Sequence, residues 1–367
     1  MTLTHAARMV RRSDVEARCR ARTPRKIFRV PLTACGQQGA YYCGKFSIGE
    51  PKQTFSAIFD TGSSLIWVPD DQCTSPACQV RRKYDKSLSH TYNHRGRSNS
   101  WEISYYDGGN VRGEFATDLL TVGGTELAQT FGLALKLSDH YVKWTFDGVF
   151  GLGPNAEIHG SNATTFLRTA VDANMLSHPI FSVYLPSHRR EPSAGGEIVF
   201  GGIDPKRYTG DLAYVDVVNN TEPAFWAVTV EDVGFNFKSM RLSGQAVIDT
   251  ASPAIHASSE TAGIIHGNIF GARFDPRWGW QVPCCHSRNT LDSFFFRIAG
   301  RAFRIPLVDL VSEPVYKQQP YCLSKILGDQ AKADLWTLGV VFIKNNYCVF
   351  DGDPTKGARI GIAQVRD

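Results

Sequence analysis

The stretch Phe59-Asp60-Thr61-Gly62-Ser63-Ser64 decides the fold, because a degraded copy of it stands at Ile248-Asp249-Thr250-Ala251-Ser252-Pro253. Each copy follows an apolar run typical of a β-strand, and an aspartate at such a strand end lies on a tight turn whose backbone NH groups can face its carboxylate. One Asp-Thr-Gly triplet recurs by chance and is weak evidence. The two aspartates are 189 residues apart in a chain of 367. This spacing predicts two similar lobes that meet at a shared cleft.

Two carboxylates brought together across such a cleft cannot both ionise at low free-energy cost. One pKa falls and the other rises, so the pair shares a single proton over an acidic pH range. The arrangement suits general acid–base hydrolysis, in which one carboxylate takes a proton from water and the other hydrogen-bonds the carbonyl under attack. This chemistry needs no metal and no cofactor. The alternative is that each aspartate only caps its turn, and the matching contexts of the two copies favour the pair.

Further stretches occur in the order found in the pepsin-like aspartic proteases, and the chain resembles that family from Tyr41 to the C-terminus. They are Trp67-Val68-Pro69, FDGVFGLG at 146–153, GGEIVFGG at 195–202, Trp336-Thr337-Leu338-Gly339 and Val349-Phe350-Asp351. The resemblance implies a mostly β, bilobal acid protease fold, in which two pseudo-twofold-related β lobes enclose an active-site cleft.

The resemblance and the aspartate spacing divide the chain into three parts. Residues 1–40 form a basic N-terminal extension similar to a propeptide, residues 41–205 the N-terminal lobe with Asp60 and a flap, and residues 206–367 the C-terminal lobe with Asp249. Short alternating apolar runs predict hairpins at 46–59 and 103–122, and the few helical patterns lie at 164–173 and 261–269.

Composition indicates a soluble globular protein, with 43% hydrophobic and 20% charged residues. No apolar stretch is long enough to predict a transmembrane helix. The net charge of +5 comes from residues 1–30, which carry nine basic side chains against Asp14 and Glu16 and leave −2 for the rest of the chain. Nucleic-acid binding would therefore depend on this extension alone, and we expect no nucleic-acid partner.

The basic extension has three interpretations. It is a solvated disordered tail, a nucleic-acid or targeting segment, or a propeptide, since KIFRVPL at 26–32 resembles the end of an aspartic-protease propeptide. On the last interpretation its positive charge lies across the acidic cleft at neutral pH and leaves when the carboxylates protonate.

Several features point to an exported protein. The chain has nine cysteines, the pair Cys73 and Cys78 has the spacing of a small disulfide loop, and glycosylation triplets begin at Asn162 and Asn219. The first thirty residues hold no apolar signal-peptide core, so we expect an incomplete or misassigned N-terminus and a secreted or vacuolar/lysosomal location.

The resemblance also implies roles for the residues around each aspartate. The hydroxyls of Thr61 and Thr250 reach the opposite turn and make the paired turns rigid, and Gly62 completes the first motif. Ser63 is expected to donate to Asp60. In the second motif Ser252 is expected to donate to Asp249, which would tune the two carboxylates apart.

A flap residue is expected in the hairpin at 103–122. The resemblance implies a tyrosine that closes over bound peptide, with Asp107-Gly108 at the tip and Trp67 as the hydrogen-bond donor to that tyrosine. Two consecutive tyrosines, Tyr105 and Tyr106, leave the register open, and Asp107-Gly108 favours Tyr105.

Cys284-Cys285-His286 suggests either a metal site or a disulfide. The sequence has no second ligand pair such as Cys-x-x-Cys, so zinc is disfavoured and we expect no metal. The resemblance implies a disulfide from Cys284 or Cys285 to Cys322. Cys19, Cys35, Cys43 and Cys348 have no predicted partner.

The leading hypothesis is an aspartic endopeptidase of acidic pH optimum, a monomer that acts on proteins and peptides and has no membrane span. Four positions depart from the family pattern: Ala251 and Pro253 in the second motif, Tyr106 in place of a flap glycine, and Val340 after Leu338-Gly339. Ala251 could strain the turn, and Pro253 removes an NH near the substrate. These departures support a rival hypothesis, a catalytically inactive homologue that binds peptides or proteins in the same cleft.

Overall fold

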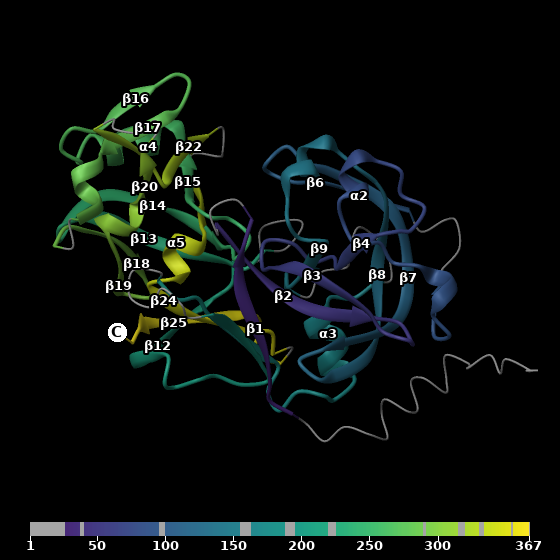
Figure 1. Cartoon of the computed structure of the whole chain (residues 1–367). Helices are drawn as coiled ribbons and strands as arrows, with labels where there is room; N and C mark the ends of the chain where they lie inside the picture. Colours follow the sequence, from purple (N-terminus) through teal and green to yellow (C-terminus); the bar gives the residue numbers. More distant parts are fainter. Residues whose placement is uncertain are drawn as a thin grey trace, which may run out of the picture.

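The computed structural model describes residues 26–36, 40–94, 100–154, 163–187, 195–218, 225–288, 291–314, 320–329, 334–353 and 355–366. Residues 1–25 of the basic extension, with Cys19, and the predicted glycosylation sites at Asn162 and Asn219 lie outside these described residues. The described part of the chain is built mainly of strands and forms two lobes above a shared base (Figure 1). The predicted mostly β, bilobal fold is confirmed.

The largest sheet runs through the N-terminal lobe and the base. Its strands, in order across the sheet, are β12 (Tyr208–Asp216), β25 (Arg359–Val365), β24 (Asn346–Asp351), β10 (Ile180–Tyr184), β11 (Gly196–Phe200), β1 (Phe28–Cys35), β2 (Tyr41–Ile48), β3 (Gln53–Asp60), β9 (Gly148–Gly151), β4 (Trp67–Pro69), β8 (Thr125–Leu137), β7 (Asn110–Val122) and β5 (Asn93–His94), with β6 (Ser100–Ser104) paired to β7.

The C-terminal lobe holds two further sheets. One has the order β19 (Arg301–Pro306), β18 (Ser293–Ile298), β13 (Ala227–Phe235), β14 (Lys238–Ile248), β23 (Leu335–Leu338), β15 (Ile255–Ser258), β22 (Ile326–Asp329), and the other β16 (Arg273–Asp275), β17 (Gly279–Pro283), β21 (Tyr321–Ser324), β20 (Val311–Pro314). The helical segments are short: α2 (Pro76–Gln79), α3 (Phe166–Asp172), α4 (Ser259–His266), α5 (Val340–Ile343), and the 3₁₀ turns η2 (Lys86–Leu88), η3 (Asp139–Lys143), η4 (Cys284–Arg288) and η5 (Leu307–Leu310).

The locally predicted elements are present. β2 and β3 form the first predicted hairpin, and β6 and β7 form the second. The two predicted helices appear as α3 and α4, because the hydroxyls of Thr165 and Ser258 accept a hydrogen bond from the backbone NH three residues on and so define where each helix starts. None of the helices in the described ranges is long and apolar enough to cross a membrane.

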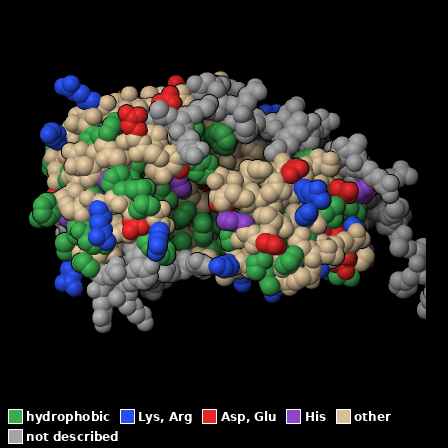
Figure 2. Space-filling model, turned by 90° about the horizontal axis from the view of Figure 1, so that it is seen from above, with side chains coloured by type: hydrophobic (Ala, Val, Ile, Leu, Met, Phe, Trp, Pro, Cys, Tyr) green, Lys and Arg blue, Asp and Glu red, His purple; other side chains and the backbone are tan. Residues whose placement is uncertain are grey.

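Strands from both halves of the chain meet in the base. β10 pairs antiparallel with β24, and the rings of Phe181 and Phe350 stack with centroids 4.7 Å apart. The buried indole NH of Trp226 donates to the carbonyl of Leu152 at 2.7 Å, which ties the start of the second lobe to the first. Seen from above, the surface is hollowed between the lobes (Figure 2). The predicted boundary after residue 205 lies between β11 and β12 and stays a prediction.

β1 is an integral strand of this base. It pairs antiparallel with β11 on one side and with β2 on the other. Buried and exposed side chains alternate along β1, and this places Phe28, Val30 and Leu32 in the hydrophobic core. Cys35 forms a disulfide with Cys43 of β2. The strand is therefore held by two ladders, by apolar burial and by a covalent bond.

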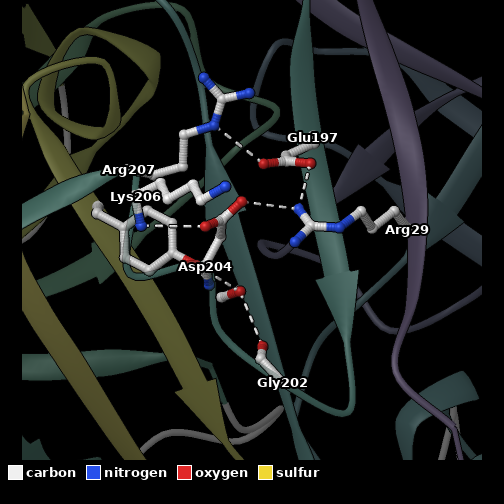
Figure 3. Close-up of polar contacts among 8 residues, drawn as sticks. Arg29, Glu197, Gly202, Asp204, Lys206 and Arg207 are labelled. Carbon is white, nitrogen blue, oxygen red and sulfur yellow. Dashed lines mark hydrogen bonds and ion pairs between the residues drawn. The ribbon is translucent and has the colours of Figure 1, made fainter.

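The exposed face of β1 carries an ion-pair network (Figure 3). The guanidinium of Arg29 lies 2.7 Å from Glu197 Oε2 and 3.0 Å from Asp204 Oδ2, and Arg207 lies 3.1 Å from Glu197 Oε1. The hydrogen bond from Arg29 to Glu197 contributes most to raising the pKa of Arg29, with burial opposing it. Because Arg29 is half exposed, these pairs add only modest stability.

The described end of the extension lies in the base. Phe28–Cys35 pairs with β11 and β2 and does not lie across the cleft. The apolar alternation of this segment fits a buried strand. The interpretation of residues 1–40 as a propeptide stays a prediction.

We predict that acid treatment leaves β1 attached to the protein. A cut between Cys35 and Cys43 would not release residues 28–35, because the disulfide spans the cut. The measurement is intact mass after incubation at acidic pH, with and without reduction. The matched control is the double variant Cys35→Ser/Cys43→Ser. A non-reduced, acid-treated protein that lacks residues 28–35 would contradict the prediction.

Candidate active site

Both aspartates lie where a strand ends beside a parallel neighbour. Asp60 is the last residue of β3, which runs parallel to β9, and Asp249 follows β14, which runs parallel to β23. The NH of Leu152 donates to the Asp60 carbonyl at 2.7 Å, and the NH of Asp249 donates to the Leu338 carbonyl at 3.1 Å. The two turns therefore begin at similar strand ends in the two lobes, and they face each other at the base of the cleft.

Two threonines lock these turns together, as the resemblance implied. The hydroxyl of Thr61 donates to the carbonyl of Ile248 at 2.7 Å and accepts from the NH of Thr250 at 3.0 Å. The hydroxyl of Thr250 donates to the carbonyl of Phe59 at 2.6 Å and accepts from the NH of Thr61 at 3.0 Å. Each buried hydroxyl thus serves one donor and one acceptor of the opposite lobe.

The two carboxylates have similar backbone donors but different side-chain donors. Asp60 accepts from the NH of Gly62 at 2.7 Å and from the hydroxyl of Ser63, as predicted. Asp249 accepts from the NH of Ala251 at 2.7 Å. The hydroxyl of Ser252, however, donates to the Ala254 carbonyl at 3.3 Å, so the expected bond from this hydroxyl to Asp249 is absent.

The Ser252 hydroxyl turns away from Asp249 toward a carbonyl of its own turn. The buried hydroxyl donates to the carbonyl of Ala254, and Pro253 between these residues has no NH to offer Asp249. The backbone NH of Ser252 still hydrogen-bonds Asp249. The second turn therefore supplies backbone donors alone, whereas the first adds a hydroxyl.

This difference separates the acidities of the two groups. Burial, and after it the Asp60 charge, raise the pKa of Asp249 to about 8. Burial also raises the pKa of Asp60, but hydrogen bonds from Ser63 and Gly62 oppose the rise. The two carboxylates also share a hydrogen bond. A single proton on the pair therefore resides on Asp249, and Asp60 is the ionised partner.

Glycine is required in the first turn but not in the second. A Cβ at Gly62 would stand 2.8 Å from the carboxyl carbon of Asp249. Ala251 has no positive φ, and its methyl group packs against the cluster of Cys43, Ile58 and Phe146. The expected strain at Ala251 is therefore not present in the structure.

The hairpin of β6 and β7 carries the flap tyrosine. The indole NH of Trp67 donates to the hydroxyl of Tyr105 at 2.7 Å, which places Tyr105 rather than Tyr106 in the position that the resemblance implied. Burial, and after it the Asp60 charge, raise the pKa of the Tyr105 phenol, so it stays protonated as a hydrogen-bond donor.

Asp107 and Gly108 shape the flap tip. The carboxylate of Asp107 accepts from the NH of Gly109 at 2.9 Å and lies 2.9 Å from the His140 ring nitrogen in η3. Gly108 has a φ of +85°, a left-handed conformation that favours glycine. The tip is thus a tight turn tied to its own lobe.

The cysteines form three disulfides in the part of the chain that the structure describes. Cys73–Cys78 is confirmed, and Cys284 rather than Cys285 pairs with Cys322, which leaves the Cys285 thiol free and exposed. Among the described residues, no group of three or more His, Cys, Asp or Glu is arranged to hold a metal ion.

Two contacts near the cleft were not predicted from the sequence. The disulfide Cys35–Cys43 could have been expected once both segments were read as adjacent antiparallel strands. The pair of His256 and Asp329 could not, because it depends on the parallel pairing of β15 with β22, two strands far apart in the sequence.

Comparisons with known proteins all point to the same family. Residues 41–365 match the family described as "Eukaryotic aspartyl protease". The chain is 33% identical to pepsin A of Rhinolophus ferrumequinum over 88% of its length and 81% of the relative. It is also 33% identical to gastricsin of Macaca fuscata fuscata (88% and 84%) and to embryonic pepsinogen of Gallus gallus (88% and 80%).

The match spans both aspartate turns, the flap hairpin and nearly all of the base sheet. Paired carboxylates at the centre of a bilobal β fold agree with it. The chain therefore belongs to the eukaryotic aspartyl protease family, and it is an aspartic endopeptidase with a pepsin-like fold.

Proposed function

We propose that Asp60 and Asp249 are the catalytic pair and hydrolyse peptide bonds at acidic pH. The observation that carries the proposal is their hydrogen-bonded contact, with donors that favour the ionised form of Asp60 and a proton on Asp249. Asp60 takes a proton from a water molecule while the Asp249 proton hydrogen-bonds the substrate carbonyl. The water oxygen bonds to the carbonyl carbon while the Asp249 proton moves to the carbonyl oxygen, so a tetrahedral gem-diol forms with Asp60 protonated and Asp249 ionised.

Breakdown of the intermediate returns the pair to its starting state. The carbon–nitrogen bond breaks, the amine leaves with the proton from Asp60, and a proton from the intermediate returns to Asp249. Atoms and charge balance without a metal or a covalent enzyme intermediate.

The substrate would be an extended segment of a protein, bound as a strand between the flap and the cleft floor. Tyr105 would cover the scissile bond and keep water out. Both carboxylates come from one chain, so a monomer is sufficient. The disulfides support a secreted or vacuolar/lysosomal location.

A peptide-binding homologue without turnover is the second candidate. Its supporting observation is the altered second motif, in which Pro253 has no NH and Ser252 does not donate its hydroxyl to Asp249. The ordinary backbone at Ala251 and the intact contacts of both carboxylates support hydrolysis instead.

The first test is cleavage of an unfolded protein or quenched peptide from about pH 2 to about pH 9. We expect activity where Asp60 is ionised and Asp249 is protonated, and loss of activity as the pH rises toward the pKa of Asp249 or falls until Asp60 protonates. Pepstatin should block it, and Asp60→Asn or Asp249→Asn should lower kcat/KM by at least about 100-fold. Binding without cleavage by the folded wild type would establish the second candidate.

The pH dependence of stability tests the pair without catalysis. The pKa of Asp249 is raised from 3.8 to about 8 by folding, so the folded state binds this proton more tightly. The contribution of this proton to stability should be greatest below about pH 4 and decline as the pH rises through about 8. Asp249→Asn should flatten this decline in thermal unfolding. Asp204→Asn is the control, because Asp204 has a lowered pKa and contributes a slope of the opposite sign.

The variant Ala251→Gly tests the departure from the family motif. Since Ala251 has an ordinary φ and a packed methyl group, the change should leave kcat/KM within about threefold and reduce the free energy of unfolding by about 0.4–1 kcal/mol. Steady-state kinetics and denaturant unfolding measure the two effects. A tenfold or larger gain in kcat/KM would show that the alanine impairs the turn.

A further inference from the structure

The second tyrosine of the flap tip reaches the opposite lobe. Tyr106 stands edge-on to the ring of His256, with centroids 5.6 Å apart and an interplanar angle of 85°. His256 lies on β15, the strand that follows the Asp249 turn. The contact therefore joins the hairpin of β6 and β7 to the C-terminal lobe.

His256 is held in place by a partner within its own lobe. Its Nδ1 lies 2.9 Å from Oδ2 of Asp329, the last residue of β22, and β15 and β22 pair in parallel. The Tyr106 hydroxyl hydrogen-bonds the same Asp329 carboxylate. Tyr106 thus contacts a half-buried polar pair with both its ring edge and its hydroxyl.

The neighbouring tip residues are held by their own lobe. Tyr105 is bonded to Trp67, and Asp107 is bonded to His140. Successive residues of the tip therefore face different lobes, and Tyr106 remains 68% exposed at the cleft mouth. Its ring and its hydroxyl nevertheless both contact residues of the C-terminal lobe.

We propose that Tyr106 is a positioning residue that docks the flap on the C-terminal lobe through His256 and Asp329. The contact holds the flap closed across the cleft, and a peptide enters or leaves only when it opens. The proposal rests on the proposed function in so far as the cleft is the substrate site. The hydrogen bond alone should shift the closed-to-open ratio by about two- to tenfold.

Amide hydrogen exchange of the flap tip in the unliganded protein tests this directly. Tyr106→Phe removes the hydroxyl and keeps the ring, and Asp329→Asn removes the charge that it contacts. Each should quicken exchange at residues 103–110 by about two- to tenfold, and the double variant should add little more, since both changes break one contact. The matched control is Tyr214→Phe, a partly exposed tyrosine on β12 whose ring lies 5.0 Å from Arg359. It should leave exchange in the flap unchanged.

A second readout is release of a bound peptide inhibitor. Tyr106→Phe and Asp329→Asn should both quicken its dissociation by a similar factor, because release requires the flap to open. Unchanged flap exchange or release in the two single variants would overturn the proposal, and so would effects that multiply in the double variant. Exchange needs no turnover, so an inactive protein with the predicted exchange pattern would refute the proposed function and leave this contact standing.

Discussion

The crossed hydrogen bonds of Thr61 and Thr250 are the constraint on which the rest of the structure depends. Each hydroxyl joins a backbone NH and a backbone carbonyl of the other lobe in a buried place. If the lobes shifted apart, these groups would lose their partners without access to water, at a cost of about 1–3 kcal/mol for each. The two carboxylates therefore stand at a separation that neither lobe can set alone.

A near-symmetric frame carries an asymmetric pair of acids. Both aspartates end equivalent strands, yet Ser63 donates its hydroxyl to Asp60 while Ser252 donates its hydroxyl to Ala254. Burial penalises ionisation of both groups, and the extra donor decides which of them ionises first. The symmetric frame brings the two acids together, and the departure from symmetry gives them different acidities.

Rigidity is distributed unevenly around the cleft. The base is held by paired strands, stacked rings such as Phe181 and Phe350, and the disulfide that joins β1 to β2. The flap is a hairpin whose tip is held by a few side-chain contacts, with Trp67, His140 and His256. The paired strands therefore fix the positions of the carboxylates, whereas the flap tip depends on a few side-chain contacts.

The sequence by itself determined the local features: the strand ends at both aspartates, the hairpins, the helical segments that became α3 and α4, and the short disulfide Cys73–Cys78. These depend on residues close together in the chain, where alternation and turn chemistry are readable. It also showed Ala251 and Pro253 as departures, without showing their effects.

The tertiary structure alone decided what depends on distant partners. The sequence favoured Tyr105 over Tyr106, but the position of Trp67 was needed to decide between them, and the direction of the Ser252 hydroxyl required the backbone of the second turn. The burial of β1 required its neighbours β2 and β11, and the meeting of Tyr106 with His256 required both lobes. Hydrogen bonds and packing between segments far apart in the chain depend on where the whole fold brings them, and no local pattern encodes that distance.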